Sequence, residues 1–204
     1  GIIDYAANFT YALNVIMHLE RLGLINQEIV ISLRSWHKEF LHWLTTSKIG
    51  KEEALAINNH GTFYDLACVV ISKFVNEPSV LEERKGIFSE YRIHEQIKED
   101  GSMPLELKRT NSFSYLLMGL KGLIELSHLY GDLEHETINK AINWVVDNGF
   151  NKAWSYTQVT EFDQGIWLLY QDVIKDYDQK WQVINKVVNK EDVINKTLWY
   201  LHKK

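Results

Sequence analysis

Hydrophobic and polar positions follow the spacing of one helix face along most of the chain. Between residues 113 and 124, for example, apolar side chains occur at Phe113, Leu116, Leu117 and Leu120. Recurrence at i, i+3, i+4 and i+7 predicts amphipathic α-helix, and no segment shows the strict alternation that predicts a half-buried strand. We therefore predict helices near residues 2–22, 26–46, 62–75, 79–98, 111–130, 134–148, 162–176 and 180–200.

Short breaks separate these predicted helices, and most of them contain glycine or proline. Because the breaks are short, neighbouring helices are expected to pack as antiparallel hairpins. The irregular segment 99–110 is long for a connection between helices and is a candidate functional loop. The pattern as a whole predicts an all-α fold with a single domain over residues 1–204.

Composition limits the classes of partner. The chain has 204 residues, of which 46% are hydrophobic and 24% charged, as in an ordinary globular domain. Its formal net charge is −5, with both signs mixed along the chain, so we expect no nucleic-acid partner. No apolar run reaches the length of a membrane span, and we expect no membrane partner. The single cysteine, Cys68, lies in an apolar helical run and should be a buried small hydrophobe.

The segment INNHGTFYD, residues 57–65, places two amides and an imidazole at the start of a predicted helix. Thr62 and Asp65 resemble a capping box, which would begin the helix at Thr62 and leave both asparagines and the histidine in the loop before it. A helix N-terminus favours a carboxylate or a developing oxyanion. The same residues are also good turn formers, so a purely structural role is the alternative.

A second segment, MPLELKRTNSFSY at residues 103–115, runs from the long loop into the next predicted helix. Arg109 would lie just outside that helix, where its planar guanidinium could bind a carboxylate. Tyr115 lies outside the apolar stripe of the helix, on a face with small residues. The phenol either packs against a close neighbouring helix or projects into a cleft.

Metal and phosphate chemistry is not indicated. The sequence has no HExxH motif, no glycine-rich phosphate loop and no Cys/His cluster. His128 and His135 share a helix face, but seven residues separate them by about 10.5 Å, which is too far to bind one metal without other ligands. We expect no metal and no cofactor.

Taken together, the two segments resemble the alginate lyase family, a group of polysaccharide lyases with an all-α toroid. The spacing from His60 to Arg109 is 109 − 60 = 49 residues, and Tyr115 follows Arg109 by six, as expected of that family. Further support comes from GIID at residues 1–4 and WHKEFLHWLTTS at residues 36–47. The resemblance covers roughly residues 1–130.

The resemblance implies β-elimination on a uronic-acid polymer. By analogy, Asn59 and Arg109 bind the uronate carboxylate, and His60 assists them. Together they stabilise the charge that develops during the reaction. His60 or Tyr115 then removes the C5 proton, and Tyr115 can return a proton to the leaving 4-oxygen. A local cluster of cationic and amide groups can bind a uronate despite the net charge of the chain. Further substrate-binding residues are expected at Asn58, Trp36 and Lys108.

Family members have a long N-terminal portion before the GIID segment, and this chain begins at that segment. We therefore expect an incomplete (α/α) toroid whose exposed apolar surface favours self-association. The expected substrate is alginate, most simply polymannuronate, and a periplasmic or secreted location follows from it. Two alternatives remain at this point: a non-catalytic uronan-binding or accessory scaffold, and a helical interaction module in which both motifs are only turns and caps.

Overall fold

The computed structural model describes residues 1–150 and 152–160 of the chain. In this part of the chain all regular elements are helical, which confirms the predicted all-α class; the predicted helices at 162–176 and 180–200 lie outside it. The elements are α1 (Ile2–Arg21), α2 (Gln27–Thr46), α3 (Lys48–Ala54), α4 (Asn59–Val75), α5 (Pro78–Ile87), the π-helical η1 (Phe88–Arg92), α6 (Ile93–Gln96), α7 (Pro104–Leu107), α8 (Ser112–Leu129), α9 (His135–Val145) and the π-helical η2 (Val146–Phe150).

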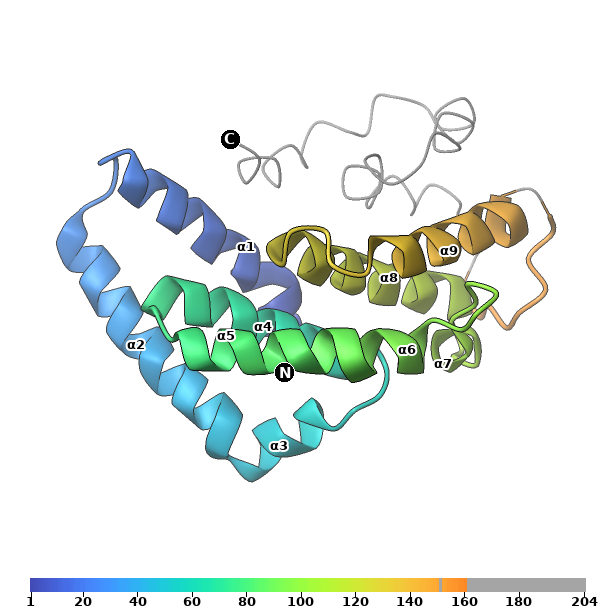
Figure 1. The fold of residues 1–204 in the computed structure, drawn as a ribbon, viewed down its shortest axis with the longest axis horizontal. Coiled ribbons are helices and arrows are strands. Elements are labelled where there is room, and N and C mark those ends of the chain that lie inside the picture. The colour runs from blue at the N-terminus through green and yellow to red at the C-terminus, as the bar shows by residue number, and fades with distance from the viewer. Residues whose placement is uncertain (151, 161–204) are drawn as a thin grey trace.

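Helix α4 forms the centre of the molecule. It packs against α1, α2, α3, α5 and α8, and Figure 1 shows it between the α1–α2 pair and the α8–α9 pair. Fourteen of its 17 residues are buried, so it has no solvent-facing stripe of the kind seen on a surface helix. Cys68 lies on this helix and is fully buried, as expected.

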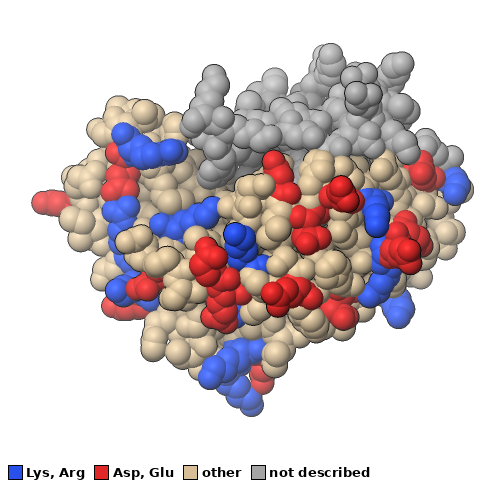
Figure 2. Space-filling view, viewed as in Figure 1, with Lys and Arg blue, Asp and Glu red and all other residues tan. Residues whose placement is uncertain are grey.

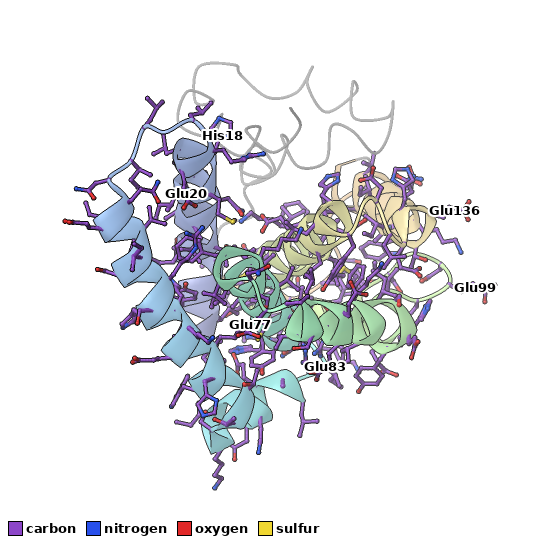
Figure 3. All side chains as sticks on the ribbon, turned by 60° about the vertical axis from the view of Figure 1, so that its left-hand side comes forward. His18, Glu20, Glu77, Glu83, Glu99 and Glu136 are labelled. Atoms are coloured by element: carbon purple, nitrogen blue, oxygen red, sulfur yellow. The ribbon has the colours of Figure 1, made fainter. Side chains whose placement is uncertain are left out.

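Helices α1 and α2 form an antiparallel hairpin. Near one end, the Tyr5 and Phe40 rings meet with their centroids 4.8 Å apart. Near the other, Glu20 accepts two hydrogen bonds from the Arg34 guanidinium, at 2.5 and 2.7 Å. Figure 3, in which Glu20 is labelled, shows the two helices side by side in this region. The predicted antiparallel hairpin is confirmed here.

Helices α4 and α8 run parallel to each other. Near their starts the Asn59 amide contacts Met118, and near their ends the Lys73 ammonium donates to the Leu129 carbonyl at 2.8 Å. A Cβ on Gly122 would lie 2.8 Å from the Thr62 methyl group, so the two helices approach too closely for a larger residue there. Their parallel direction brings both N-termini to the same end of the molecule.

The start of α4 differs from the prediction. The helix begins at Asn59, and the Asn58 side chain caps it by accepting the His60 N–H at 3.1 Å. The predicted capping box at residues 62–65 is therefore wrong. Thr62 is buried inside the helix and accepts a hydrogen bond from Gln96, and Asp65 forms ion pairs with two arginines.

Three other elements also differ from the predicted boundaries. The single helix expected over 79–98 is interrupted by the π-helical turn η1. The short helices α3 and α7 were not predicted, and α7 lies within the segment 99–110 that was expected to be irregular. Each is seven residues or shorter, which is too short for a hydrophobic period to be distinctive.

Exposed large apolar side chains are concentrated in the first three helices and their connections. Ten of the 13 found in the described residues lie between residues 9 and 57, on α1, α2, α3 and their connections. We call residues 9–57 the α1–α3 edge. Among the described residues, this segment has most of the exposed large apolar side chains. The ten are Phe9, Leu22, Leu24, Ile29, Ile31, Trp36, Trp43, Ile49, Leu55 and Ile57.

Candidate active site

The candidate site lies where α4 and α8 begin. The first turn of α4 carries Asn59 and His60, the turn before α8 carries Arg109, and the first turn of α8 carries Tyr115. The short helix α7 packs against α8 and supplies a carboxyl group between them, that of Glu106. Arg109 and Tyr115 follow His60 by 49 and 55 residues. They reach the same end of the fold as His60 because α4 and α8 are parallel.

Asn59 is completely buried. Its backbone N–H donates to Oε1 of Glu106 at 2.8 Å, which satisfies one of the N–H groups that a helix start leaves without an internal partner. Its side-chain nitrogen reaches only the Met118 sulfur, at 3.8 Å, and a thioether is a weak acceptor. Within the described residues the Oδ1 atom has no hydrogen-bond partner. The side chain of Asn59 therefore has unused hydrogen-bonding capacity.

His60 is more accessible, with 39% of its side chain exposed. Its Nδ1 atom lies 2.7 Å from Oε1 of Glu53, which comes from the short helix α3. Because a carboxylate only accepts hydrogen bonds, Nδ1 carries the proton in this pair. In the neutral imidazole Nε2 is then the atom with a free lone pair, which is the arrangement a general base requires.

Arg109 and Tyr115 form a stacked pair. The guanidinium carbon lies 3.9 Å from the centroid of the Tyr115 ring, a close cation–π contact. The Arg109 side chain is 31% exposed, and its nearest carboxyl group is Glu106, with Nη1 at 3.8 Å from Oε2. Arg109 therefore lies just outside helix α8, as predicted, and part of its charge remains open to solvent.

Two carboxyl groups of the site were not predicted. Burial raises the pKa of Glu106, while the Asn59 N–H, Arg109 and His60 each oppose that rise. The Glu106 carboxyl is therefore close enough to Asn59, Arg109 and His60 for each of them to act on its pKa. Glu53 and Glu106 are respectively 7 and 47 residues from the partners they contact, so no local pattern pointed to either pairing.

The remaining predicted binding residues occupy different places. Asn58 is the N-cap of α4 and is next to the site in the chain. Lys108 is exposed at the end of α7. Trp36 lies on α2, is 52% exposed and stacks on Phe40 with ring centroids 5.1 Å apart. The ring contacts of Trp36 with His37 and Phe40 keep to the α2 surface, so they do not join it to the cluster at α4 and α8.

The entrance of α8 is held by a distant segment. The Ser112 N–H and hydroxyl both donate to the Thr157 carbonyl, at 3.1 and 2.6 Å. The Phe113 N–H donates to the Gln158 side chain at 3.1 Å, and the Trp154 indole donates to the Ser112 hydroxyl at 2.9 Å. These bonds satisfy the N–H groups of the turn that leads to Tyr115.

The described residues show neither a metal-binding cluster nor a membrane-spanning helix. Residues 1–150 and 152–160 contain no group of three His, Cys, Asp or Glu side chains placed to hold a metal ion. In the same ranges, no helix is both long and apolar enough to span a bilayer. Figure 2 shows acidic and basic side chains interspersed over the visible face, in agreement with the mixed charge of the sequence.

The comparisons with known proteins agree with this fold. The all-α fold is that of part of a polysaccharide lyase: an alginate lyase from Bacteroides ovatus superposes with a TM-score of 0.76 at 23% sequence identity, over 89% of this chain and 52% of that one. The alginate lyase family model matches residues 1–155, and the chain belongs to that family.

The predicted family and fold are therefore confirmed, while the roles of individual residues stay predictions. The chain spans about half the length of the Bacteroides ovatus protein, so the activity of a whole lyase does not transfer directly. The comparison with curated proteins gave no match.

Proposed function

We propose that the protein is a polysaccharide lyase that cleaves a uronic-acid polymer, most simply the mannuronate-rich part of alginate, by β-elimination. One observation carries this proposal. Asn59 and His60 lie at the start of α4, Arg109 and Tyr115 lie about 50 residues later at the start of α8, and the Glu106 carboxyl contacts both Asn59 and Arg109, in a chain of the alginate lyase family.

The chemistry first requires that the substrate carboxylate be neutralised. The C5 proton of a uronate is barely acidic while that carboxylate keeps its full charge. In this proposal Arg109 and the Asn59 side chain bind the carboxylate and stabilise the enolate-like charge that develops on it. Because the side-chain nitrogen of the buried Asn59 contacts the Met118 sulfur, the flexible methionine must turn aside so that the carboxylate replaces that sulfur.

Proton transfer then falls to His60 and Tyr115. Nε2 of His60 or the phenolate of Tyr115 takes the C5 proton, depending on the epimer at C5. The electrons of the C5–H bond form the C4–C5 double bond, and the C4–O4 bond breaks. The Tyr115 hydroxyl delivers a proton to the departing O4, so each product chain ends in a neutral hydroxyl or an unsaturated uronate.

Two further expectations belong to this proposal. The elimination uses only side chains of the protein, so a chelator should leave the rate unchanged. A polymer as large as alginate is met outside the cytoplasm, so we propose a periplasmic or secreted location. Fractionation of the source cells, with activity followed in each fraction, would test the location.

A non-catalytic role is the second candidate, because the chain spans about half of the lyase it resembles. In that case the same groups would bind a uronan without cleaving it. Substrate cleavage, rather than binding, separates the two proposals.

The deciding experiment follows ultraviolet absorbance during incubation with polymannuronate, polyguluronate and other uronans. Elimination creates a double bond conjugated to the carboxylate, which absorbs where the substrate does not. Tyr115→Phe should lower the rate by about 10²- to 10⁴-fold. The control is Tyr91→Phe, at an exposed tyrosine of η1, which should keep the wild-type rate. A flat trace on every uronan would contradict the lyase proposal, and measurable uronan affinity in that case would favour the binding role.

We also propose that the α1–α3 edge supports self-association of the chain. Its ten exposed apolar side chains are the support for this proposal. Sedimentation velocity over a range of protein concentrations would test it. A monomer at all concentrations would contradict the proposal, and replacing Phe9 and Trp43 by serine should shift any dimer toward monomer.

A further inference from the structure

Glu106 is a buried carboxyl group to which the proposed reaction gives no role. It is 1% exposed and lies on α7, a helix of only four residues. Of its two carboxyl oxygens, Oε1 accepts the Asn59 N–H at 2.8 Å, and Oε2 has no hydrogen-bond partner within the described residues. A buried carboxyl is costly unless it is paired, so its retention here needs a reason.

The contacts of Glu106 join the two halves of the candidate site. On one side its carboxyl binds the first turn of α4, where the partial positive charge of a helix start favours an anion. On the other side it lies beside Arg109, which stacks on Tyr115. A Cβ on Gly119 of α8 would lie 3.3 Å from Cγ of Glu106, so α8 closes against this side chain. One carboxyl thus contacts α4 and α8 and the turn between α7 and α8.

The spacing between Glu106 and Arg109 suits a shared ligand. The Arg109 backbone N–H donates to the Glu106 carbonyl at 3.0 Å, but their side chains meet only as an ion pair, with Nη1 3.8 Å from Oε2, which is too long for a hydrogen bond. Arg109 is therefore held electrostatically, while the hydrogen-bonding fork of its guanidinium remains available to a second carboxylate. A full bidentate pair with Glu106 would have consumed that capacity.

We propose that Glu106 is a positioning residue, which holds the first turn of α4 and the Arg109 guanidinium at the spacing needed to receive one substrate carboxylate. This inference rests on the proposed lyase function. Glu106 does not touch the reacting atoms; it acts through Asn59 and Arg109. Its charge keeps Arg109 near Asn59, and its Oε1 atom keeps the Asn59 backbone in place.

Two substitutions separate these two contributions. Glu106→Gln keeps an oxygen that can accept the Asn59 N–H but removes the charge beside Arg109. We expect kcat on the responsive uronan to fall about 10²-fold, with little change in KM, because a misplaced carboxylate clamp acts mainly on the transition state. The matched control is Glu125→Gln, which replaces a second buried carboxyl group, on α8, ten residues and about 15 Å along the helix from Tyr115. This control should retain wild-type kcat.

Glu106→Ala removes the acceptor as well. Hydrogen exchange of the Asn59 amide should then accelerate at least about tenfold, while Glu106→Gln leaves it near the wild-type rate. Circular dichroism of each variant establishes that it is folded. Unchanged Asn59 exchange in Glu106→Ala, wild-type kcat in Glu106→Gln, or an equal loss in Glu125→Gln would each overturn the proposal. If the wild type cleaves no uronan, the lyase function fails, and the exchange measurement still decides whether Glu106 holds Asn59.

Discussion

Asp65 and Glu106 are two buried carboxyl groups with very different partners. Asp65 receives hydrogen bonds from Arg92 at 2.8 Å and from Arg84 at 3.3 Å. Glu106 receives one backbone N–H, and its nearest guanidinium nitrogen is 3.8 Å away. Burial raises the pKa of both groups, and the opposing partners are two arginines for Asp65 but only one nearby arginine for Glu106, together with the Asn59 N–H and His60.

The difference separates a structural ion pair from a group at a candidate site. We call the Asp65 network closed because each oxygen of its carboxylate accepts a hydrogen bond from an arginine, although Nε of Arg84 has no partner within the described residues. Arg92 also donates to the carbonyls of Ala54 and Ala56 and so ties η1 to the segment before α4. We call the Glu106 network open because neither Oε2 of Glu106 nor the Asn59 amide oxygen has a hydrogen-bond partner among residues 1–150 and 152–160, and Arg109 is partly exposed. Groups whose pKa values are shifted by burial and a nearby charge are concentrated at functional sites.

The largest loss of stability is expected from replacing Asp65, the carboxylate of the closed network. Asp65→Asn leaves two buried guanidinium groups without their carboxylate, and this should cost about 3–5 kcal/mol of unfolding free energy. Urea unfolding monitored by circular dichroism measures that loss. Glu39→Gln, at an exposed acid of α2, should change the unfolding free energy very little. A small loss in Asp65→Asn would mean that the two arginines are satisfied by other groups.

A smaller loss is expected from Gly61→Ala. The added methyl would lie 2.0 Å from the Ala56 carbonyl oxygen and 2.2 Å from Nη1 of Arg92, so it must displace the arginine that supports Asp65. We expect a loss of about 1–3 kcal/mol in thermal or urea unfolding. Gly86→Ala is the matched control, because nothing lies within 4 Å of its added Cβ. That helical substitution should stabilise by up to about 1 kcal/mol.

The titration of Glu106 should make the unfolding free energy depend on pH. Burial in the folded state raises the pKa of Glu106, so folding favours the protonated carboxyl. The resulting contribution of Glu106 to the unfolding free energy is present at low pH and is lost as pH rises through the folded pKa. Glu106→Gln does not titrate, so it should gain stability relative to wild type as pH rises above about 4.5, with a slope of at most about 1.4 kcal/mol per pH unit. Unfolding curves of both proteins at a series of pH values test this. If the stability of Glu106→Gln relative to wild type instead increased as pH falls, the predicted direction of the pH dependence would be contradicted.

The smallest effect on stability is expected from Arg109→Ala. Its ion pair is long and its side chain partly exposed, so the unfolding free energy should fall by less than about 1 kcal/mol. In the absorbance assay the same variant should lose about 10²- to 10³-fold in kcat, because it removes the charge that neutralises the substrate. A large loss of stability with an unaffected rate would reverse the assignment of this residue to the site.

Much of the helical framework followed from hydrophobic spacing. The boundaries of α1 and α2 agree with the predicted ranges to within one residue. The start of α4 was misplaced because Thr62 and Asp65 match a capping box, whereas their side chains bond to groups on η1, α5 and α6. Local pattern cannot distinguish a cap from a buried network when the partners are 19 or more residues away.

The candidate site was predicted in part. His60, Arg109 and Tyr115 were identified from two motifs and their spacing, and the structure places them at one end of the fold. Glu53 and Glu106 were missed because neither lies in a pattern with the residue it contacts. Glu106 was visible in the second motif, three residues before Arg109, but only the packing of α7 against α8 turns it toward Asn59.

The bonds between α8 and residues 157–160 bear on where this domain can be cut. The family match ends at residue 155, and a chain shortened there would lose the Thr157 carbonyl and the Gln158 side chain that satisfy the first N–H groups of α8. The helix start that presents Tyr115 would then fray first. A boundary set by homology would remove residues 157–160, all four of which hydrogen-bond to residues 110–113 at the start of α8, so a usable truncation should extend to at least residue 160.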